Sequence, residues 1–385
     1  MISLSLLAMR RWSAWLINVF IFTGSTLFAC LLAEGLARAL CPSWAPRTAH
    51  LAQFWQYDAT YGWVHIPNAK GRFKADGYDT EVTINDKGFR GPSIPYKRTP
   101  GYRRILLLGD SFVWGFGVDF DQTVGERLRA LQPNLEVVNL GVSGYSTDQE
   151  LLLYQQEGVK YRADLVVVVV SSNDFHGNQR TEEYLIYGKP AFIPQGDGLH
   201  LVNQPVRQVS WVRRLAVKMA WESYILTRLQ RYLYEISVDK AMRQTYSQPA
   251  SFSNGISAAT ASQLSFPRTA SWDILIRLLK AFNDVTSREG AKFLVAFVED
   301  IDARDASRYL KQLGVESVML QDSINPTDPA THLPGDFHWN AAGHQQAAEV
   351  LSAKVRELLG LPPEAARNPS LSLVVHPGTI LVGFA

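Results

Sequence analysis

Two uninterrupted apolar runs constrain the fold of this chain more than any other feature. Five consecutive valines occupy residues 166–170, and Ile105 to Leu108 form a second aliphatic run. Such runs are typical of strands buried on both faces of a parallel sheet, because a strand with one wet face alternates apolar and polar residues. Both runs therefore predict central strands.

Helical and strand patterns alternate around these two runs. Further strands are predicted at 136–140 and 291–298, and helices at 124–131, 148–158, 271–288 and 340–359. The expected N-cap of the helix at 148–158 is Thr147 or Asp148. Strands that alternate with helices favour right-handed crossovers, so we predict a three-layer α/β/α sandwich with a mostly parallel central sheet.

The N-terminal segment is apolar enough to cross a bilayer. Residues 12–33 carry no charge, and about twenty such residues suffice for a transmembrane helix. Arg10 and Arg11 precede this segment and favour a cytoplasmic N-terminus, with the rest of the chain on the extracytoplasmic side. We expect an uncleaved, single-pass anchor. The alternatives are a cleaved signal peptide, lipoprotein processing at Cys30, and a buried soluble helix.

The remaining chain divides by composition. Residues 42–100 are rich in Pro, Gly, Tyr and Trp, with a strand expected at 81–85 and a turn in which Gly88 and Gly91 can take positive φ. A long helical pattern at 211–236 is interpreted as a helix packed over the domain, or else as a membrane-surface helix or a lid. The predicted units are a membrane anchor (1–41), a β-rich collar (42–100), an α/β domain (101–360) with a helical insertion at about 176–268, and a C-terminal tail (361–385).

Charge and cysteine content argue against a nucleic-acid-binding protein and against a fold held together by disulfides. The formal net charge is +2, with no basic run, which gives no electrostatic case for nucleic-acid binding. The two cysteines, Cys30 and Cys41, are too few for a disulfide framework.

Small and polar residues follow three of the predicted strands. These are Asp110–Ser111, the stretch 141–144, and the stretch 171–174. Ligands of open α/β sheets bind beyond the carboxyl ends of the strands, where helix N-termini offer backbone donors. The three stretches therefore predict a binding or catalytic site.

Each polar residue has a functional and a structural interpretation. Ser111 is a candidate nucleophile, or else an ordinary helix N-cap. Asn173 can donate its amide to a developing oxyanion, or else caps a loop. Gly144 can present an unobstructed N–H, or else serves only a tight turn.

A general base for Ser111 is expected from GDFHWNAAGH at residues 335–344. Asp336 and His338 stand two residues apart, ahead of a helix that Asn340 is predicted to N-cap. A serine hydroxyl needs a base within hydrogen-bond reach, and a carboxylate can fix that base's tautomer. The alternative is a metal site formed by His332, His338 and His344 with Asp336, although no familiar ligand spacing fits.

Together these motifs resemble the SGNH/GDSL hydrolase superfamily, whose sheet is flavodoxin-like. LLGDSFVWG resembles the first block, with Ser111 as nucleophile and oxyanion donor, and VVNLGVSGYST the second, with Gly144 as donor. SSND resembles the third, with Asn173 as donor, and DFHWNAAGH the last, with Asp336 and His338 completing a triad. Ser171 stands where the third block usually has glycine, and the carboxylate precedes the histidine by two residues instead of three.

The resemblance implies a serine esterase without a metal or cofactor. Its expected substrates are O-acyl esters, such as acetyl esters, of carbohydrates or polysaccharides, lipids or small molecules. Two alternatives remain: an O-acyltransferase acting on extracellular polysaccharide, and a non-catalytic membrane-tethered binding or assembly protein. The motifs predict no substrate-binding residues.

Overall fold

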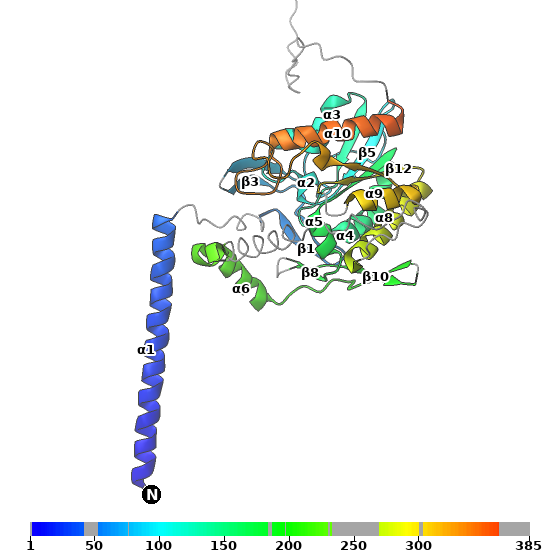
Figure 1. Cartoon of the computed structure of the whole chain (residues 1–385). Helices are drawn as coiled ribbons and strands as arrows, with labels where there is room; N and C mark the ends of the chain where they lie inside the picture. The colour runs from blue at the N-terminus through cyan, green and yellow to red at the C-terminus, as the bar shows by residue number, and fades with distance from the viewer. Residues whose placement is uncertain are drawn as a thin grey trace, which may run out of the picture.

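The computed structural model describes residues 2–41, 53–75, 77–183, 187–196, 198–229, 232, 269–299 and 303–361. A long N-terminal helix, α1 (Ile2–Leu40), extends away from a compact α/β body (Figure 1). The residues expected to form the C-terminal tail lie outside the described part, except Leu361 at its start.

Five parallel strands form the central sheet. Its strands are β5 (Arg103–Leu108), β6 (Leu135–Asn139), β7 (Leu165–Val170), β12 (Lys292–Phe297) and β13 (Glu316–Met319). They lie in the order β13-β12-β7-β5-β6, with every pairing parallel. Numbered along the chain, this is the flavodoxin-like order 2-1-3-4-5, in which the order reverses between β5 and β7. The predicted fold class is confirmed.

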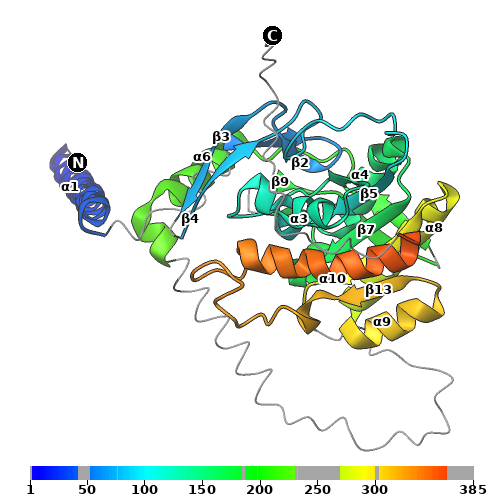
Figure 2. The ribbon, with the colours of Figure 1, turned by 90° about the horizontal axis from the view of Figure 1, so that it is seen from above.

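Helices cover both faces of this sheet. The main ones are α3 (Val124–Leu131), α4 (Thr147–Gln156), α8 (Ala270–Arg288), α9 (Ala303–Gln312) and α10 (Ala341–Leu359). In Figure 2, α10 crosses one face next to α3, and these helices pack together. On the other face, α4 and α8 lie against each other. The molecule therefore has the three predicted layers.

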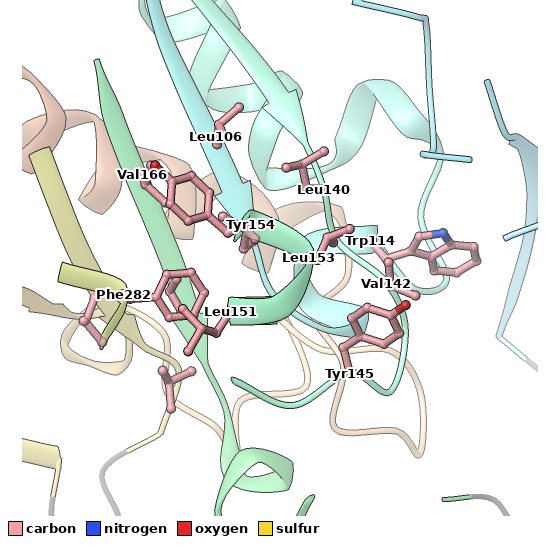
Figure 3. Close-up of a cluster of buried hydrophobic side chains, with 14 of the residues drawn as sticks. Leu106, Trp114, Leu140, Val142, Tyr145, Leu151, Leu153, Tyr154, Val166 and Phe282 are labelled. Carbon is pink, nitrogen blue, oxygen red and sulfur yellow. The ribbon is translucent and has the colours of Figure 1, made fainter. Parts of the chain in front are cut away.

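The valine run lies in the middle strand and serves both layers. Val166, Val168 and Val170 point into the cluster on the α4 and α8 side, part of which Figure 3 shows. Val167 and Val169 point into the cluster on the α3 and α10 side. All five are at most 1% exposed. This two-sided burial is why the strand carries no polar residue.

The described part of the collar contains two antiparallel hairpins. They are β1 (Trp55–Asp58) with β2 (Gly62–His65), and β3 (Lys70–Ala75) with β4 (Tyr78–Thr83). The strand expected at 81–85 begins earlier, at Tyr78, and Ile84 forms only an isolated bridge with Arg90. Gly88 and Gly91 have φ of 83° and 99°, as expected for the turn.

Four short strands of the insertion pair in two antiparallel pairs ahead of its helix. The strands are β8 (Glu182–Glu183), β9 (Tyr187–Gly188), β10 (Ala191–Gln195) and β11 (Gly198–Val202). Helix α6 (Trp211–Glu222) follows with Ser223 as its C-cap, and residues 224–229 are again helical. Most of the predicted helix beyond that point lies outside the described residues.

Helix α1 contains a segment that is long and apolar enough to cross a membrane, Trp15–Leu40. Its side chains are largely exposed: Phe20, Phe22 and Phe28 are each at least 67% accessible. The predicted apolar N-terminal helix is therefore present, and its large apolar side chains are not packed into the α/β body.

Candidate active site

Three loops converge where the strand order reverses, beyond the carboxyl ends of β5, β6 and β7. The chain runs from β5 into the short helix α2 (Ser111–Trp114) and from β6 into the turn at Gly144. From β7 it runs into α5 (Ser172–Gly177). The strand topology thus brings together the polar residues that follow the three strands.

A tight turn presents Ser111. Asp110 is the N-cap of α2, and its carboxylate accepts a 2.9 Å hydrogen bond from the Phe112 N–H. Gly115 ends the helix with φ of 86°. A Cβ at Gly109 would stand 2.4 Å from Val113 Cγ2, so the entry to the turn needs glycine. Ser111 is therefore the first residue of the helix, and Asp110 holds the N-cap position.

Ser111, His338 and Asp336 form one hydrogen-bonded chain. The distance between Ser111 Oγ and His338 Nε2 is 2.7 Å, and His338 Nδ1 lies 2.6 Å from Asp336 Oδ1. The same carboxylate oxygen accepts the His338 backbone N–H at 3.1 Å. A carboxylate two residues ahead of the histidine can therefore contact its ring. With Nδ1 donating to Asp336, Nε2 is free to accept the serine proton.

Aromatic rings enclose the imidazole of His338. Phe116 and Phe337 both stack on it, with centroid distances of 4.2 Å and interplanar angles of 18° and 28°. Phe116 is partly buried, whereas Phe337 is 55% exposed. His338 itself is only 8% exposed. The ring therefore has little room to rotate away from Ser111.

Asn340 fixes the loop that carries His338, as predicted. Its side chain accepts the N–H groups of Ala342 and Gly343 at the start of α10, at 2.8 and 3.2 Å. Its amide donates to the carbonyls of Ala330 and His332. One side chain thus caps the helix and ties together both ends of the loop.

Gly144 and Asn173 lie at the ends of the neighbouring loops. Gly144 has φ of 82°, a backbone conformation that favours glycine. Within the described part of the chain, the N–H groups of Ser111 and Gly144 donate to no protein acceptor. Asn173 Nδ2 makes one long bond, 3.3 Å to the Tyr145 carbonyl, and the Asn173 side chain also bonds to the Asp110 carboxyl.

Ser171 orients the Asn173 side chain. Its hydroxyl lies 2.7 Å from Asn173 Oδ1 and 2.9 Å from Asp110 Oδ2. The single hydroxyl hydrogen is shared between these two oxygens, and the Asn173 amide nitrogen faces the Tyr145 carbonyl. The serine that replaces the usual glycine therefore links the nucleophile's turn to the loop after β7.

Buried carboxyl groups lie behind these loops. Asp174 accepts hydrogen bonds from Thr147 N, Thr147 Oγ1 and Ser171 N, at 2.6 to 2.8 Å, and so joins the loop after β7 to the start of α4. Burial, reinforced by the nearby Asp110 charge, raises the pKa of Asp174 to about 7. Burial likewise raises the pKa of Asp110. It also raises the pKa of Glu150 well above its usual range, with like charge from Asp174 and Asp110 adding to the effect.

Lys189 from the insertion neutralises part of this cluster. Its ammonium donates to both oxygens of Asp148, at 2.8 and 2.7 Å, and to the Gly177 carbonyl at 2.7 Å. Both side chains are essentially inaccessible. Asp148 is thus the partner of a buried ion pair, and the N-cap of α4 is Ser146, not Thr147 or Asp148 as predicted. The N–H and the hydroxyl of Thr147 both donate to the Asp174 carboxylate, so this hydroxyl does not cap α4.

The collar braces two of the active-site loops. Arg90 is 2% exposed and donates to the carbonyls of Trp114, Gly115 and Val118, which surround the end of α2. Trp63 Nε1 donates to the Ser143 carbonyl at 3.2 Å, next to Gly144. The collar is therefore part of the support of the site and not merely a connection to α1.

The alternative metal set does not converge. His332 Nδ1 lies 2.9 Å from Thr331 Oγ1 and 3.0 Å from the Asp328 carbonyl. His344 Nδ1 instead accepts the Val124 N–H at the start of α3, at 3.2 Å. Among the described residues, no three His, Cys, Asp or Glu side chains gather as metal ligands.

A flavodoxin-like sheet with a hydrogen-bonded serine and histidine at its carboxyl edge is the architecture of a serine-type hydrolase. The model of the GDSL-like Lipase/Acylhydrolase family matches residues 107–346, which is more than half of the chain. The chain therefore belongs to this family of hydrolases, and the predicted SGNH/GDSL membership is confirmed. Among curated proteins, none matches the chain.

Several solved structures are similar to this chain. A family 3 carbohydrate esterase from Clostridium thermocellum matches with 13% identity and a TM-score of 0.38, covering 68% of this chain and 98% of its own. A member of the lipolytic protein G-D-S-L family from Veillonella parvula DSM 2008 has 11% identity and a TM-score of 0.35, covering 66% and 97%. A two-domain esterase active on acetylated mannans has 11% identity and a TM-score of 0.36, covering 69% and 51%.

Sequence reasoning missed the supports of the site. Arg90 and Lys189 are basic residues in irregular segments, where exposure is the usual expectation, and both are buried. Phe116 belongs to an aromatic and glycine-rich stretch directly after Ser111, which was a usable signal. Its stacking partner, however, lies more than two hundred residues further along the chain.

Proposed function

We propose that the protein is a serine esterase in which Ser111, His338 and Asp336 act as a catalytic triad. The observation that carries this proposal is the continuous hydrogen-bonded chain from Ser111 Oγ through the His338 ring to Asp336, with distances of 2.7 and 2.6 Å. A serine within reach of a base that a carboxylate orients is the arrangement that acyl transfer through a serine requires.

In the first half of the reaction, His338 Nε2 takes the Ser111 proton as Oγ attacks the ester carbonyl. Asp336 stabilises the imidazolium that forms. The protonated His338 then gives its proton to the leaving alcohol, and an acyl-serine remains. In the second half, His338 deprotonates a water molecule, which attacks the acyl group. The imidazolium then returns the proton to Ser111 Oγ as the carboxylic acid is released.

The oxyanion of each tetrahedral intermediate is assigned to three donors: the N–H groups of Ser111 and Gly144 and the side-chain amide of Asn173. The N–H groups of Ser111 and Gly144, which donate to no acceptor among the described residues, support this assignment. The hydrogen bonds from such preorganised donors strengthen as negative charge develops on the carbonyl oxygen. They therefore lower the activation barrier of acyl transfer. Ser171 acts on Asn173 and is a positioning residue.

We further propose that the substrate is an O-acyl ester with a short acyl group, such as acetyl, carried by a carbohydrate or polysaccharide. Phe337 gives one exposed apolar surface beside His338. Hydrolysis is favoured over transfer as the simpler outcome, since water needs no binding site of its own. No residue is assigned to carrier binding.

Anchoring in a membrane is proposed for helix α1. The segment Trp15–Leu40 is long and apolar enough to span a bilayer, its large side chains are exposed, and the Arg10–Arg11 pair precedes it. By the charge rule this leaves the N-terminus in the cytoplasm and the esterase domain on the extracytoplasmic side.

The test is turnover of acetyl esters by the full chain in detergent, with Ser111→Ala as its matched control. Wild type should release acetate from p-nitrophenyl acetate and from acetylated polysaccharide, and the variant should not. Mixing the ester with a deacetylated saccharide separates the two reactions: acetate appears in solution for hydrolysis and on the saccharide for transfer. Equal rates for wild type and Ser111→Ala would refute the proposed mechanism.

A further inference from the structure

Helix α6 has an apolar surface that no part of the described chain covers. Trp211, Val212, Leu215 and Met219 are 69%, 56%, 50% and 63% exposed. At about 100° per residue these four side chains fall within roughly 100° of the helix circumference, so they form one stripe. We call this set the α6 stripe.

Positive charge accompanies the stripe. Residues 207–221 contain four basic residues and no acidic one. Arg214 and Lys218 are exposed on α6 and, by the same helical geometry, lie along one border of the stripe. Glu222 at the end of the helix is the one acidic residue of α6, and its carboxylate is 3.8 Å from the Lys218 ammonium.

Helix α6 is tied to α1 where the apolar segment of α1 first carries charge. Glu34 accepts hydrogen bonds from the Ser223 hydroxyl and the Tyr224 N–H, both at 2.9 Å. Arg38 pairs with Glu34 and donates to the Glu222 carbonyl at 2.8 Å. The Arg38 guanidinium also lies 5.2 Å from the Tyr224 ring centroid. These contacts set the position of the end of α6 along α1.

The two helices point in different directions. Both views show α6 beside the C-terminal end of α1, and α6 runs across the direction of α1 instead of along it (Figures 1 and 2). A charged pair such as Glu34 and Arg38 at the end of a spanning helix belongs at the level of the lipid headgroups. A helix attached at that point and running across the span therefore lies at headgroup depth.

We propose that α6 is a membrane-surface helix that inserts the α6 stripe into the leaflet where α1 ends, with Arg214 and Lys218 contacting anionic phospholipid headgroups. This inference rests on the proposed anchoring by α1. An apolar stripe with a basic border and an exposed tryptophan is the composition that such interfacial helices require. The helix would act as a second contact that holds the esterase domain in a fixed orientation over the bilayer.

The test uses nitroxide spin labels on the full chain, with one molecule in each lipid nanodisc. Cys30 and Cys41 are replaced by serine, and a single cysteine is introduced by Leu215→Cys. Matched controls carry the label at Phe28→Cys in α1 and at Leu313→Cys after α9, positions that are 67% and 37% exposed. The readout is collision of each label with oxygen, which concentrates in lipid, and with a nickel chelate, which stays in water.

In discs that contain phosphatidylglycerol, the Leu215→Cys label should lose nickel collisions and gain oxygen collisions, as the Phe28→Cys label does. The Leu313→Cys label should keep its nickel collisions. Adding Arg214→Gln and Lys218→Gln should restore nickel collisions at Leu215→Cys. An unchanged result in that variant would overturn the assignment to anionic headgroups.

Two other results would overturn the inference while leaving the anchor in place. If the Leu215→Cys label collides with nickel as freely as the Leu313→Cys label, the stripe faces water. If it is shielded from both reagents, protein covers the stripe, such as a second copy of this chain. If the Phe28→Cys label itself stays exposed to nickel, the anchoring proposal fails, and the inference fails with it.

Discussion

Acidification should weaken the attachment of helix α10, and with it the loop that carries His338, through His344. This side chain is 1% exposed, and its Nδ1 accepts the Val124 N–H at 3.2 Å, which joins the start of α10 to the start of α3. Burial lowers the pKa of His344 from 6.5 to about 3, with positive charge from Arg90 and His338 contributing. The folded protein therefore keeps this ring neutral at pH values where the unfolded chain protonates it.

The sign and size of the effect follow from the two pKa values. Above pH 6.5 neither state binds the proton, so the full stability is present. Below it only the unfolded chain takes up a proton, and the free energy of unfolding falls by about 1.4 kcal/mol for each pH unit. Lowering the pH from 6.5 to about 5 should therefore remove about 2 kcal/mol on account of His344 alone. The loss continues until the pH approaches the folded pKa.

Urea unfolding of the full chain in detergent micelles, followed by tryptophan fluorescence at a series of pH values, measures this directly. His344→Gln retains an acceptor for the Val124 N–H but cannot be protonated, so its free energy of unfolding should depend less on pH, by about 2 kcal/mol over the same interval. His65, whose pKa burial lowers to about 4, contributes a similar dependence that the variant keeps. The reasoning is wrong if wild type and His344→Gln lose the same free energy on acidification.

Three further substitutions test other parts of the site. Asn173→Ala should lower kcat by about 10²–10³ with little change in urea stability, measured by initial rates on p-nitrophenyl acetate; an unaltered kcat removes Asn173 from the oxyanion site. Arg90→Met should lower the free energy of unfolding by at least about 3 kcal/mol and also lower kcat, because three carbonyls around the end of α2 lose a charged donor. If neither the free energy of unfolding nor kcat falls, the collar does not support Ser111. Gly141→Ala should destabilise the chain by about 1–3 kcal/mol, because its Cβ would stand 2.5 Å from Trp114 N, and a thermal midpoint equal to wild type would contradict this packing.

The parts of this molecule that the sequence predicts are those whose cause is local. A run of valines has few places to go except a strand covered on both faces, and β7 is the middle strand of the sheet. The polar residues after β5, β6 and β7 meet because parallel strands share a carboxyl edge. Asn340 caps α10 because an N-cap needs only its own helix.

Features with a weak local pattern, or with partners far away in the sequence, were not predicted. Strand β13 (Glu316–Met319) has a polar beginning and only one buried residue, since it lies at the edge of the sheet. Helix α9 buries Ala303, Ala306 and Leu310 at helical spacing, but two of the three are alanines among charged residues. The burial of Lys189 depends on Asp148, forty-one residues earlier, and neither residue signals the other in the sequence.

The same distinction applies to the site. The pairing of Asp336 with His338 follows from their spacing, whereas the contact of His338 with Ser111 spans 227 residues and depends on the whole fold. The phenyl rings on either side of the imidazole come from two different loops, and only the three-dimensional structure brings them together.

The most direct test of the proposed mechanism is covalent labelling of the native chain with a fluorophosphonate, followed by peptide mass spectrometry. The serine that His338 activates should displace fluoride and retain the phosphonyl group. We expect one adduct, on the peptide that contains Ser111, and its loss in His338→Ala and in urea-unfolded wild type. An esterase-active chain whose Ser111 stays unlabelled, or whose adduct lies on another residue, would contradict the assignment of Ser111 as the nucleophile.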